Sequence, residues 1–237
     1  MAAGRPKPDP SVMLALAKNP LFAPLHDDDL HSLVARGQLR RYRTRALIFL
    51  QGDRADEVFC VVEGRVSVYA TTPEGRQQLY ALLNPGELFG DLGVVGDMPR
   101  SATAESLEDC TLWGVSGEVF LEFLANHFEV ARALMSALAR QVVAVDATVE
   151  DLLFLDVKGR IAKRLLALAD QSPTEASGEG IAVPWELSQT QLASFCGTTR
   201  ENMSRVLAEF QRRGLVERKG RRYILSDPDT LRRLAGL

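Results

Sequence analysis

Cysteine, histidine and long apolar runs are scarce in this chain of 237 residues. The 3 Cys and 3 His are scattered, with no CxxC pair and no spacing typical of a metal site. We therefore expect buried thiols in a reducing compartment and no disulfide framework. The apolar runs are too short to span a membrane, and residues 1–10 lack the apolar segment of a secretory signal. These absences favour a cytoplasmic protein with a disordered lead at residues 1–10.

Charge is distributed unevenly between the two ends of the sequence. From Lys158 onward there are 14 basic and 9 acidic residues, a net charge of +5, whereas the whole chain carries −3. The first 157 residues therefore carry −8. An acidic first part and a basic last part indicate that the last part meets a polyanion, although chance asymmetry of this size is common.

Apolar residues repeat at heptad spacing in the middle of the chain. The steps between them alternate between 4 and 3 residues, and no proline or glycine interrupts the stretch from His127 to Asp156. The spacing predicts a long helix that packs against a second copy of itself. A helix buried against its own domain is the alternative, but such helices usually have a wider apolar face. The seam consists of Ala131, Met135, Leu138, Val142, Val145, Val149 and Leu152.

Apolar residues recur with strand periodicity before this helix. Turn signals rich in Gly, Pro, Asn and Asp separate short runs at intervals of roughly a dozen residues, which is typical of an antiparallel barrel or roll. We predict strands at 47–50, 58–62, 66–69 and 79–83, and a last strand pair at 101–105 and 111–115. Short helices are expected within 11–37 and at 119–125.

A glycine-rich stretch, Leu88–Val95, is followed closely by Arg100 and Ser101. Glycine lets backbone N–H groups approach a phosphate, and arginine can bind phosphate oxygens through two N–H groups. The serine hydroxyl adds a further donor. The stretch is therefore a candidate phosphate site, with an ordinary glycine-rich turn as the alternative.

The stretch 186–207 has the pattern of a helix-turn-helix. Ser188 with Gln191 and Thr198 with Glu201 have the spacing of capping boxes, and Gly197 lies at the turn between the two helices. The alternative is a surface helical hairpin. The apolar contacts between the helices are expected from Leu192, Phe195, Val206 and Phe210.

The start of the second helix carries side chains suited to reading bases. Arg200, Glu201 and Arg205 can share a face, and arginine pairs with guanine while glutamate accepts from cytosine. Residues 212–225 are then expected to form a helix end and a two-stranded wing with a basic tip, where Lys219 and Arg221 would contact phosphates.

These parts, in this order, resemble the cyclic-AMP receptor protein / fumarate–nitrate regulator (CRP/FNR) family of bacterial transcription factors over nearly the whole chain. The resemblance implies an α+β protein with a jelly-roll-like cyclic-nucleotide-binding domain at 11–126, a dimerisation helix at 127–156 and a winged helix-turn-helix at 157–237. The phrases that carry it are Leu47–Asp53, Val62–Gly64, Glu74–Arg76, Phe89–Gly93, Arg100–Thr103, Phe154–Ala162 and Gly197–Arg205.

The resemblance also assigns roles to residues. Arg100 and Ser101 are expected to hold the cyclic phosphate, and Asp91 stands where cyclic-AMP binders usually have a glutamate on the ribose hydroxyl. Because aspartate is shorter than glutamate, Asp91 would either bind the ribose hydroxyl through a water molecule or indicate a ligand other than cyclic AMP. The ligand-binding set is Gly90, Asp91, Leu92, Arg100, Ser101, Val145 and Asp146. The DNA-binding set is Ser188, Gln189, Thr199, Arg200, Glu201, Ser204, Arg205, Lys219 and Arg221.

The sequence is compatible with either an adenine or a guanine nucleotide as the effector. Cyclic AMP is expected first, but the two helix positions that meet adenine in cyclic-AMP receptors are here Val145 and Asp146. A carboxylate matches the two adjacent donors of guanine, so cyclic GMP or a cyclic dinucleotide is the alternative, together with a protein active without ligand.

The expected partners are a palindromic DNA operator with TGTGA-like half-sites, a second copy of the chain and, for an activator, RNA polymerase. No N-terminal cysteine group for an iron–sulfur cluster and no haem ligand pair is evident, and no metal cluster, nucleophile–base pair or Walker loop indicates an enzyme.

Overall fold

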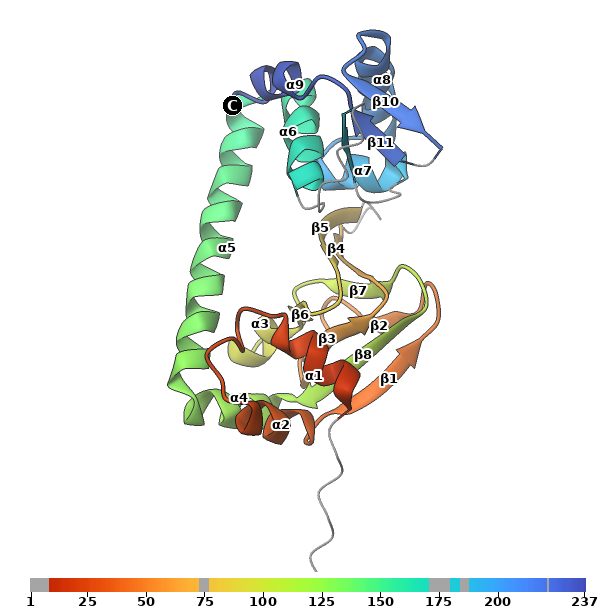
Figure 1. Ribbon diagram of the computed structural model, residues 1–237. Helices are drawn as coiled ribbons and strands as arrows, with labels where there is room; N and C mark the ends of the chain where they lie inside the picture. Colours follow the sequence, from red (N-terminus) through yellow and green to blue (C-terminus); the bar gives the residue numbers. More distant parts are fainter. Residues whose placement is uncertain (1–8, 73–76, 171–179, 184–187, 221) are drawn as a thin grey trace, which may run out of the picture. The chain divides into compact units, whose positions relative to one another are not determined.

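The computed structural model describes residues 9–72, 77–170, 180–183, 188–220 and 222–237 (Figure 1). Parts of the sequence predictions lie outside these residues: most of the lead at 1–10, the phrase Glu74–Arg76, and Arg221. Contacts divide the chain into two compact units, Met1–Arg140 and Gln141–Leu237. The boundary falls inside one helix, α5 (Phe128–Phe154).

The first unit is a β-roll with helices. Its helices are α1 (Pro10–Ala17), α2 (Asp27–Val34), α3 (Asp91–Val95), α4 (Gly117–Asn126) and the first part of α5. Its strands are β1 (Gln38–Tyr42), β2 (Leu47–Phe49), β3 (Glu57–Glu63), β4 (Val66–Thr71), β5 (Gln77–Leu83), β6 (Leu88–Phe89), β7 (Thr103–Ser106) and β8 (Cys110–Ser116).

The strands form two antiparallel sheets, in the orders β1-β8-β3-β6 and β2-β7-β4-β5. The predicted roll is confirmed, but the predicted pairing of the last two strands is wrong. β7 pairs with β2 and β4, whereas β8 pairs with β1 and β3. A sequence pattern that shows two adjacent strands does not reveal that the chain changes sheet between them.

Two apolar clusters use opposite faces of the sheet that contains β3. Phe59 and Val61 pack against residues of the second sheet, including Ala104 and Leu83. Val58 and Cys60 point the other way, toward α1, α2, α4 and α5, because successive strand residues face opposite sides. β3 is therefore buried on both faces, and the loops and short helices around it are anchored to it.

The helix α5 contributes to the first unit through Val130 and Leu134, which are buried in the helical cluster. The heptad seam lies on another side of the helix. Met135, Val142, Val145, Val149 and Leu152 are 48–61% exposed, while Ala131 and Leu138 are half-buried. The seam, which runs through both units, is thus an apolar stripe that is largely exposed.

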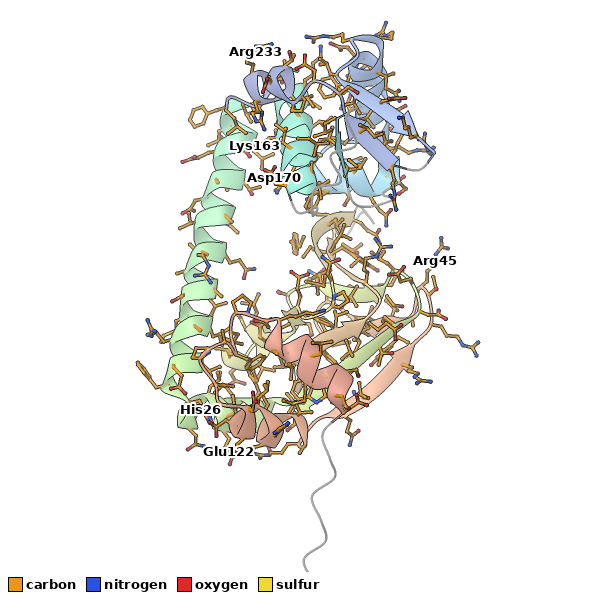
Figure 2. All side chains as sticks on the ribbon, viewed as in Figure 1. His26, Arg45, Glu122, Lys163, Asp170 and Arg233 are labelled. Atoms are coloured by element: carbon orange, nitrogen blue, oxygen red, sulfur yellow. The ribbon has the colours of Figure 1, made fainter. Side chains whose placement is uncertain are left out.

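The second unit contains the rest of α5 and a three-stranded sheet in the order β10-β11-β9. The helix α6 packs against α9 and α8. Lys163 of α6, labelled in Figure 2, bonds to Asp151 of α5 with an Nζ–Oδ1 distance of 2.6 Å. The elements are α6 (Val157–Asp170), β9 (Ile181–Ala182), α7 (Gln189–Phe195), α8 (Arg200–Arg212), β10 (Val216–Lys219), β11 (Arg222–Leu225) and α9 (Pro228–Leu234).

The predicted buried thiols are confirmed. Cys60, Cys110 and Cys196 are buried and free, and burial raises the pKa of Cys60 and of Cys196 to about 12. The thiol of each is therefore protonated at neutral pH and a poor nucleophile. Of the helices in the described part of the chain, none is both long and apolar enough to cross a membrane.

Candidate functional site

The glycine-rich stretch turns sharply between β6 and α3. Gly90 has a φ of +81° and precedes the first residue of α3. A Cβ at this position would lie 2.5 Å from Nη1 of Arg100, so both the backbone conformation and the close approach of the arginine require glycine. The glycine-rich sequence predicted a turn here, but not the short helix Asp91–Val95 that follows it.

Arg100 is held firmly although it is a charged residue. Its side chain is 5% exposed; Nη1 donates to the carbonyl oxygen of Gly90 and Nη2 to that of Glu57, each at 2.7 Å. Its backbone N–H donates to the carbonyl of Asp53 and its carbonyl accepts from Gly52. Main chain and side chain are therefore both fixed.

The third guanidinium nitrogen of Arg100 is different. Nε is buried and has no hydrogen-bond partner among the described residues. Burial also lowers the pKa of Arg100, and the nearby carboxylates of Asp56, Glu57, Asp53 and Asp91 oppose this effect. A buried cation with one unsatisfied donor is costly, and a phosphate oxygen would remove that cost.

The other predicted ligand residues of the first unit lie around Arg100. Asp91 is the first residue of α3, and burial raises the pKa of its carboxyl while backbone N–H groups and Arg100 oppose the shift. Ser101 follows Arg100 and is exposed, and Leu92 is half-buried on α3. The structure thus brings together Gly90, Asp91 and Arg100, with Ser101 next to Arg100 in the chain.

Sequence reasoning missed one neighbour of Arg100. The guanidinium carbon of Arg100 lies 4.2 Å from the centre of the Phe49 ring, on β2. In the sequence Phe49 is an ordinary apolar strand residue, and no local signal relates it to an arginine some fifty positions later.

A separate cavity of about 840 Å³ lies beside this stretch. Its lining includes Arg54 but also four carboxylates, on Asp56, Glu57, Asp97 and Glu118. Asp56 and Glu57 are also among the acidic residues near Arg100, and the Glu57 carboxylate accepts from both terminal guanidinium nitrogens of Arg40. The residues that line the cavity therefore carry charges of both signs.

In the second unit, two capped helices form the helix-turn-helix. The predicted capping box of Ser188 and Gln191 is confirmed, because the serine oxygen accepts from the Gln191 N–H and the glutamine side chain accepts from the Ser188 N–H. Gly197 has a φ of +60° in the turn. The predicted apolar contacts are also confirmed in part, since Leu192, Val206 and Phe210 are buried and Phe195 is half-buried.

The cap of the second helix is shifted by one residue from the prediction. Thr199, not Thr198, precedes the helix, and its hydroxyl accepts from the Asn202 N–H at 3.2 Å. The two adjacent threonines made the choice ambiguous in the sequence. The position of α8 is further fixed by Lys158 of α6, whose Nζ lies 2.7 Å from Oε1 of Glu209.

The predicted base-reading residues are all exposed near the start of α8. Arg200, Glu201 and Arg205 lie there, and all three are exposed, whereas Met203 and Val206 of the same helix are buried. Arg205 Nη2 donates to Asn202 Oδ1 at 2.6 Å, a contact that sequence reasoning did not foresee. The other predicted DNA residues of this motif, Ser188, Thr199 and Ser204, are exposed, and Gln189 is half-buried.

The wing consists of the antiparallel strands β10 and β11. Arg218, Lys219 and Arg222 are exposed on these strands, and Arg218 lies 5.9 Å from the centre of the Tyr223 ring. Val145 and Asp146, predicted to meet the base of the ligand, are exposed on α5 in the part that belongs to the second unit.

Comparisons with known proteins identify two domains in this chain. A model of the cyclic nucleotide-binding domain matches residues 39–127, and a model of the Crp-like helix-turn-helix domain matches residues 159–234. The cAMP-activated global transcriptional regulator Vfr of Pseudomonas aeruginosa is 30% identical over 200 residues, which cover 83% of this chain and 92% of Vfr. The chain belongs to the CRP/FNR family. It is a transcription regulator with a cyclic-nucleotide-binding domain and a DNA-binding helix-turn-helix.

Other CRP-like proteins match most of this chain. The CRP-like cAMP-activated global transcriptional regulator of Mycobacterium tuberculosis is 27% identical over 220 residues, 93% of this chain and 98% of that protein. Among solved structures, the c-di-GMP responsive global regulator CLP of Xanthomonas campestris has a TM-score of 0.74 and 25% identity, covering 84% of this chain and 99% of CLP.

Proposed function

We propose that this CRP/FNR protein is a cytoplasmic homodimer that binds a palindromic operator in response to a cyclic nucleotide, cyclic AMP in the first place. The observation that carries the ligand class is the buried Nε of Arg100, a cationic donor without a partner among the described residues. The cyclic phosphate would accept from Nε and from the Ser101 hydroxyl. The relatives named as cAMP-activated support adenine as the base.

Guanine is the second candidate, and the carboxylate of Asp146 favours it. An ionised carboxylate accepts hydrogen bonds from two adjacent donors, as guanine presents at N1 and N2, while Val145 offers adenine no hydrogen bond. Asp91 in place of a glutamate also fits a ligand other than cyclic AMP. The likeness to a regulator described as c-di-GMP responsive supports the same alternative.

The exposed seam of α5 supports dimerisation. Five apolar side chains between Met135 and Leu152 are 48–61% exposed, an arrangement that costs free energy unless another apolar surface covers them. A second α5 in a parallel coiled coil would cover the stripe at matching heptad positions. Two recognition helices would then meet half-sites about 34 Å apart on DNA.

DNA reading is assigned to α8. Arg200 and Arg205 would donate to guanine O6 and N7, and Glu201 would accept from cytosine N4, which suits TGTGA-like half-sites. The basic wing would contact phosphates without reading sequence. Ligand binding would favour the DNA-competent arrangement of the dimer, and a change from mostly inactive to mostly active needs about 5.5 kcal/mol of differential binding. As an activator, the dimer would also contact RNA polymerase.

One experiment tests the ligand and its effect together. The full-length protein is titrated calorimetrically with cyclic AMP, cyclic GMP and cyclic di-GMP, and its binding to a TGTGA palindrome and to a scrambled duplex is then measured at several salt concentrations. We expect cyclic AMP to bind and to raise affinity for the palindrome only. A guanine preference that Asp146→Ala removes would establish the second candidate.

Two results would contradict the proposal. Equal affinity for the two duplexes with a steep salt slope would identify a nonspecific DNA-binding protein. Strong palindrome binding without any nucleotide bound would identify a regulator that is active without ligand.

A further inference from the structure

Three phenylalanine rings form a cluster beside Arg100. Phe49 of β2 lies 6.0 Å from Phe59 of β3 and 5.9 Å from Phe89 of β6, measured between ring centres. Phe59 and Phe89 are stacked at 5.4 Å. The two deeper rings, 3% and 5% exposed, support Phe49, which is half-buried and forms the outer member of the cluster.

The Arg100 guanidinium lies over the ring of Phe49. The guanidinium carbon is 4.2 Å from the centre of the Phe49 ring but 5.9 Å from that of Phe59. Nη1 and Nη2 of the guanidinium donate to the carbonyls of Gly90 and Glu57, and the guanidinium carbon lies over the Phe49 ring. Nε remains as the donor without a partner among the described residues.

A bulge in β2 directs Phe49 to this position. Leu47 pairs with Glu105, and Phe49 pairs with Ala104, so the register advances two residues on β2 for one on β7. A bulge of this kind changes the direction of the side chains that follow it. Without it, strand alternation would place Leu47 and Phe49 on the same face, whereas Leu47 is 52% exposed and Phe49 joins the core cluster.

We infer that Phe49 is a positioning residue for the ligand: its ring helps to hold the Arg100 guanidinium, whose buried Nε has no partner among the described residues, in the orientation that an anionic oxygen meets. The inference rests on the proposed cyclic-nucleotide binding and adds a residue to it. An arginine without this support would have to be ordered when the ligand binds, at about 0.5–1.5 kcal/mol for an immobilised side chain.

The main test is calorimetric titration of the full-length protein with the nucleotide that the wild type binds. We expect Phe49→Leu to weaken binding by roughly 3- to 10-fold, which corresponds to that ordering cost. Phe49→Tyr keeps the aromatic face and should bind within about 2-fold of the wild type. Phe120→Leu is the matched control, because Phe120 is a fully buried ring in the other cluster of the same unit.

A spectroscopic measurement separates positioning from simple packing. The Nε–H proton resonance of Arg100, assigned by its loss in Arg100→Lys, lies next to the ring and should be shifted upfield by its ring current. We expect this resonance to move downfield in Phe49→Leu, to keep its position in Phe120→Leu, and to change on nucleotide binding in the wild type.

The outcomes are distinguishable. Wild-type protein that bound none of the three cyclic nucleotides would remove the proposed function. Wild-type binding with unchanged affinity in Phe49→Leu would overturn only the role of Phe49. Equal losses in Phe49→Leu and Phe49→Tyr, or an equal loss in Phe120→Leu, would also overturn it, because the effect would then follow core packing and not the aromatic face.

Discussion

The two units use arginine in opposite ways. In the first unit, Arg100 is 5% exposed, lies over an aromatic ring and is bonded to two backbone carbonyls. In the second unit, Arg200 and Arg205 are exposed on a helix surface, and Arg205 donates to a neighbouring side chain, Asn202. One cation is fixed before any ligand arrives, whereas the other two are free to adapt.

This difference follows from the size of the anion each unit is suited to meet. A small cyclic phosphate offers few contacts, so each contact must be strong, and a buried, pre-oriented donor supplies that strength in a low-dielectric environment. Duplex DNA offers many phosphates and releases counterions on binding, so exposed side chains on rigid helices suffice. The fold provides a fixed arginine in one unit and a fixed helix in the other.

Removing the buried cation should have the largest effect. We expect Arg100→Gln to weaken cyclic-nucleotide binding by about 100-fold or more, because charge-assisted hydrogen bonds contribute about 1.5–3 kcal/mol each. Calorimetric titration measures the loss. Because the carbonyls of Gly90 and Glu57 lose their donors in this variant, circular dichroism is used to check that the variant folds. Affinity within threefold of the wild type would contradict the assignment of the phosphate site to Arg100.

Removing an exposed cation should have a smaller and sequence-dependent effect. Arg200→Ala is expected to cost about 1–3 kcal/mol on the palindrome and to relax specificity at one base pair. Arg222→Ala, in the wing, is the matched control and should weaken binding to all duplexes alike with a smaller salt slope. Electrophoretic mobility shifts with single-base variants measure both. An equal loss of affinity for all duplexes in Arg200→Ala would show that Arg200 contacts the DNA backbone and does not read a base.

The sequence predicted the second unit in more detail than the first. Caps, turn glycines and the apolar positions of a helix-turn-helix are local signals, and they located α7 and α8 to within one residue of the observed caps. The one error, Thr198 for Thr199, arose because two adjacent residues have the same capping chemistry.

The ligand stretch of the first unit could be located from the sequence, but its construction could not. Gly90 and Arg100 were found because glycine and arginine have recognisable uses near phosphates. The contribution of Phe49, the carbonyl of Glu57 and the change of sheet between β7 and β8 depend on pairings between distant segments. No local pattern encodes such contacts.

The contribution of helix capping to the helix-turn-helix can be tested by measuring stability. We expect Ser188→Ala to lower the free energy of unfolding by about 1 kcal/mol, because the capping hydroxyl satisfies the Gln191 N–H. Urea unfolding monitored by circular dichroism measures the change. Thr190→Ala, at an exposed site on α7, is the control and should change stability by less than about 0.5 kcal/mol. Equal stability of the two variants would remove the role of the cap.

The smallest expected effect concerns the acid beside the buried arginine. Burial raises the pKa of Asp91 above its ordinary value of 3.8. Between that value and the raised pKa, the folded protein keeps a proton that the unfolded chain has released, so this carboxyl lowers stability as pH rises through that window. Asp91→Asn carries no such charge. We expect the ligand-free variant to unfold at a higher temperature than the wild type at neutral pH, and the difference to shrink as pH falls toward 3.8.

Thermal unfolding of both proteins from pH 4.5 to pH 8 measures this difference, and nucleotide titration of the variant completes the test. Arg100 attracts the Asp91 carboxylate and opposes the shift, yet burial is the larger influence on the pKa. A ribose hydroxyl bound by Asp91 would give this buried acid a role in ligand binding. A variant that is more stable at neutral pH but binds nucleotide more weakly would show that the first unit sacrifices stability for its ligand. A temperature difference independent of pH would mean that Asp91 titrates as an ordinary exposed acid and that burial of charge in this unit is confined to Arg100.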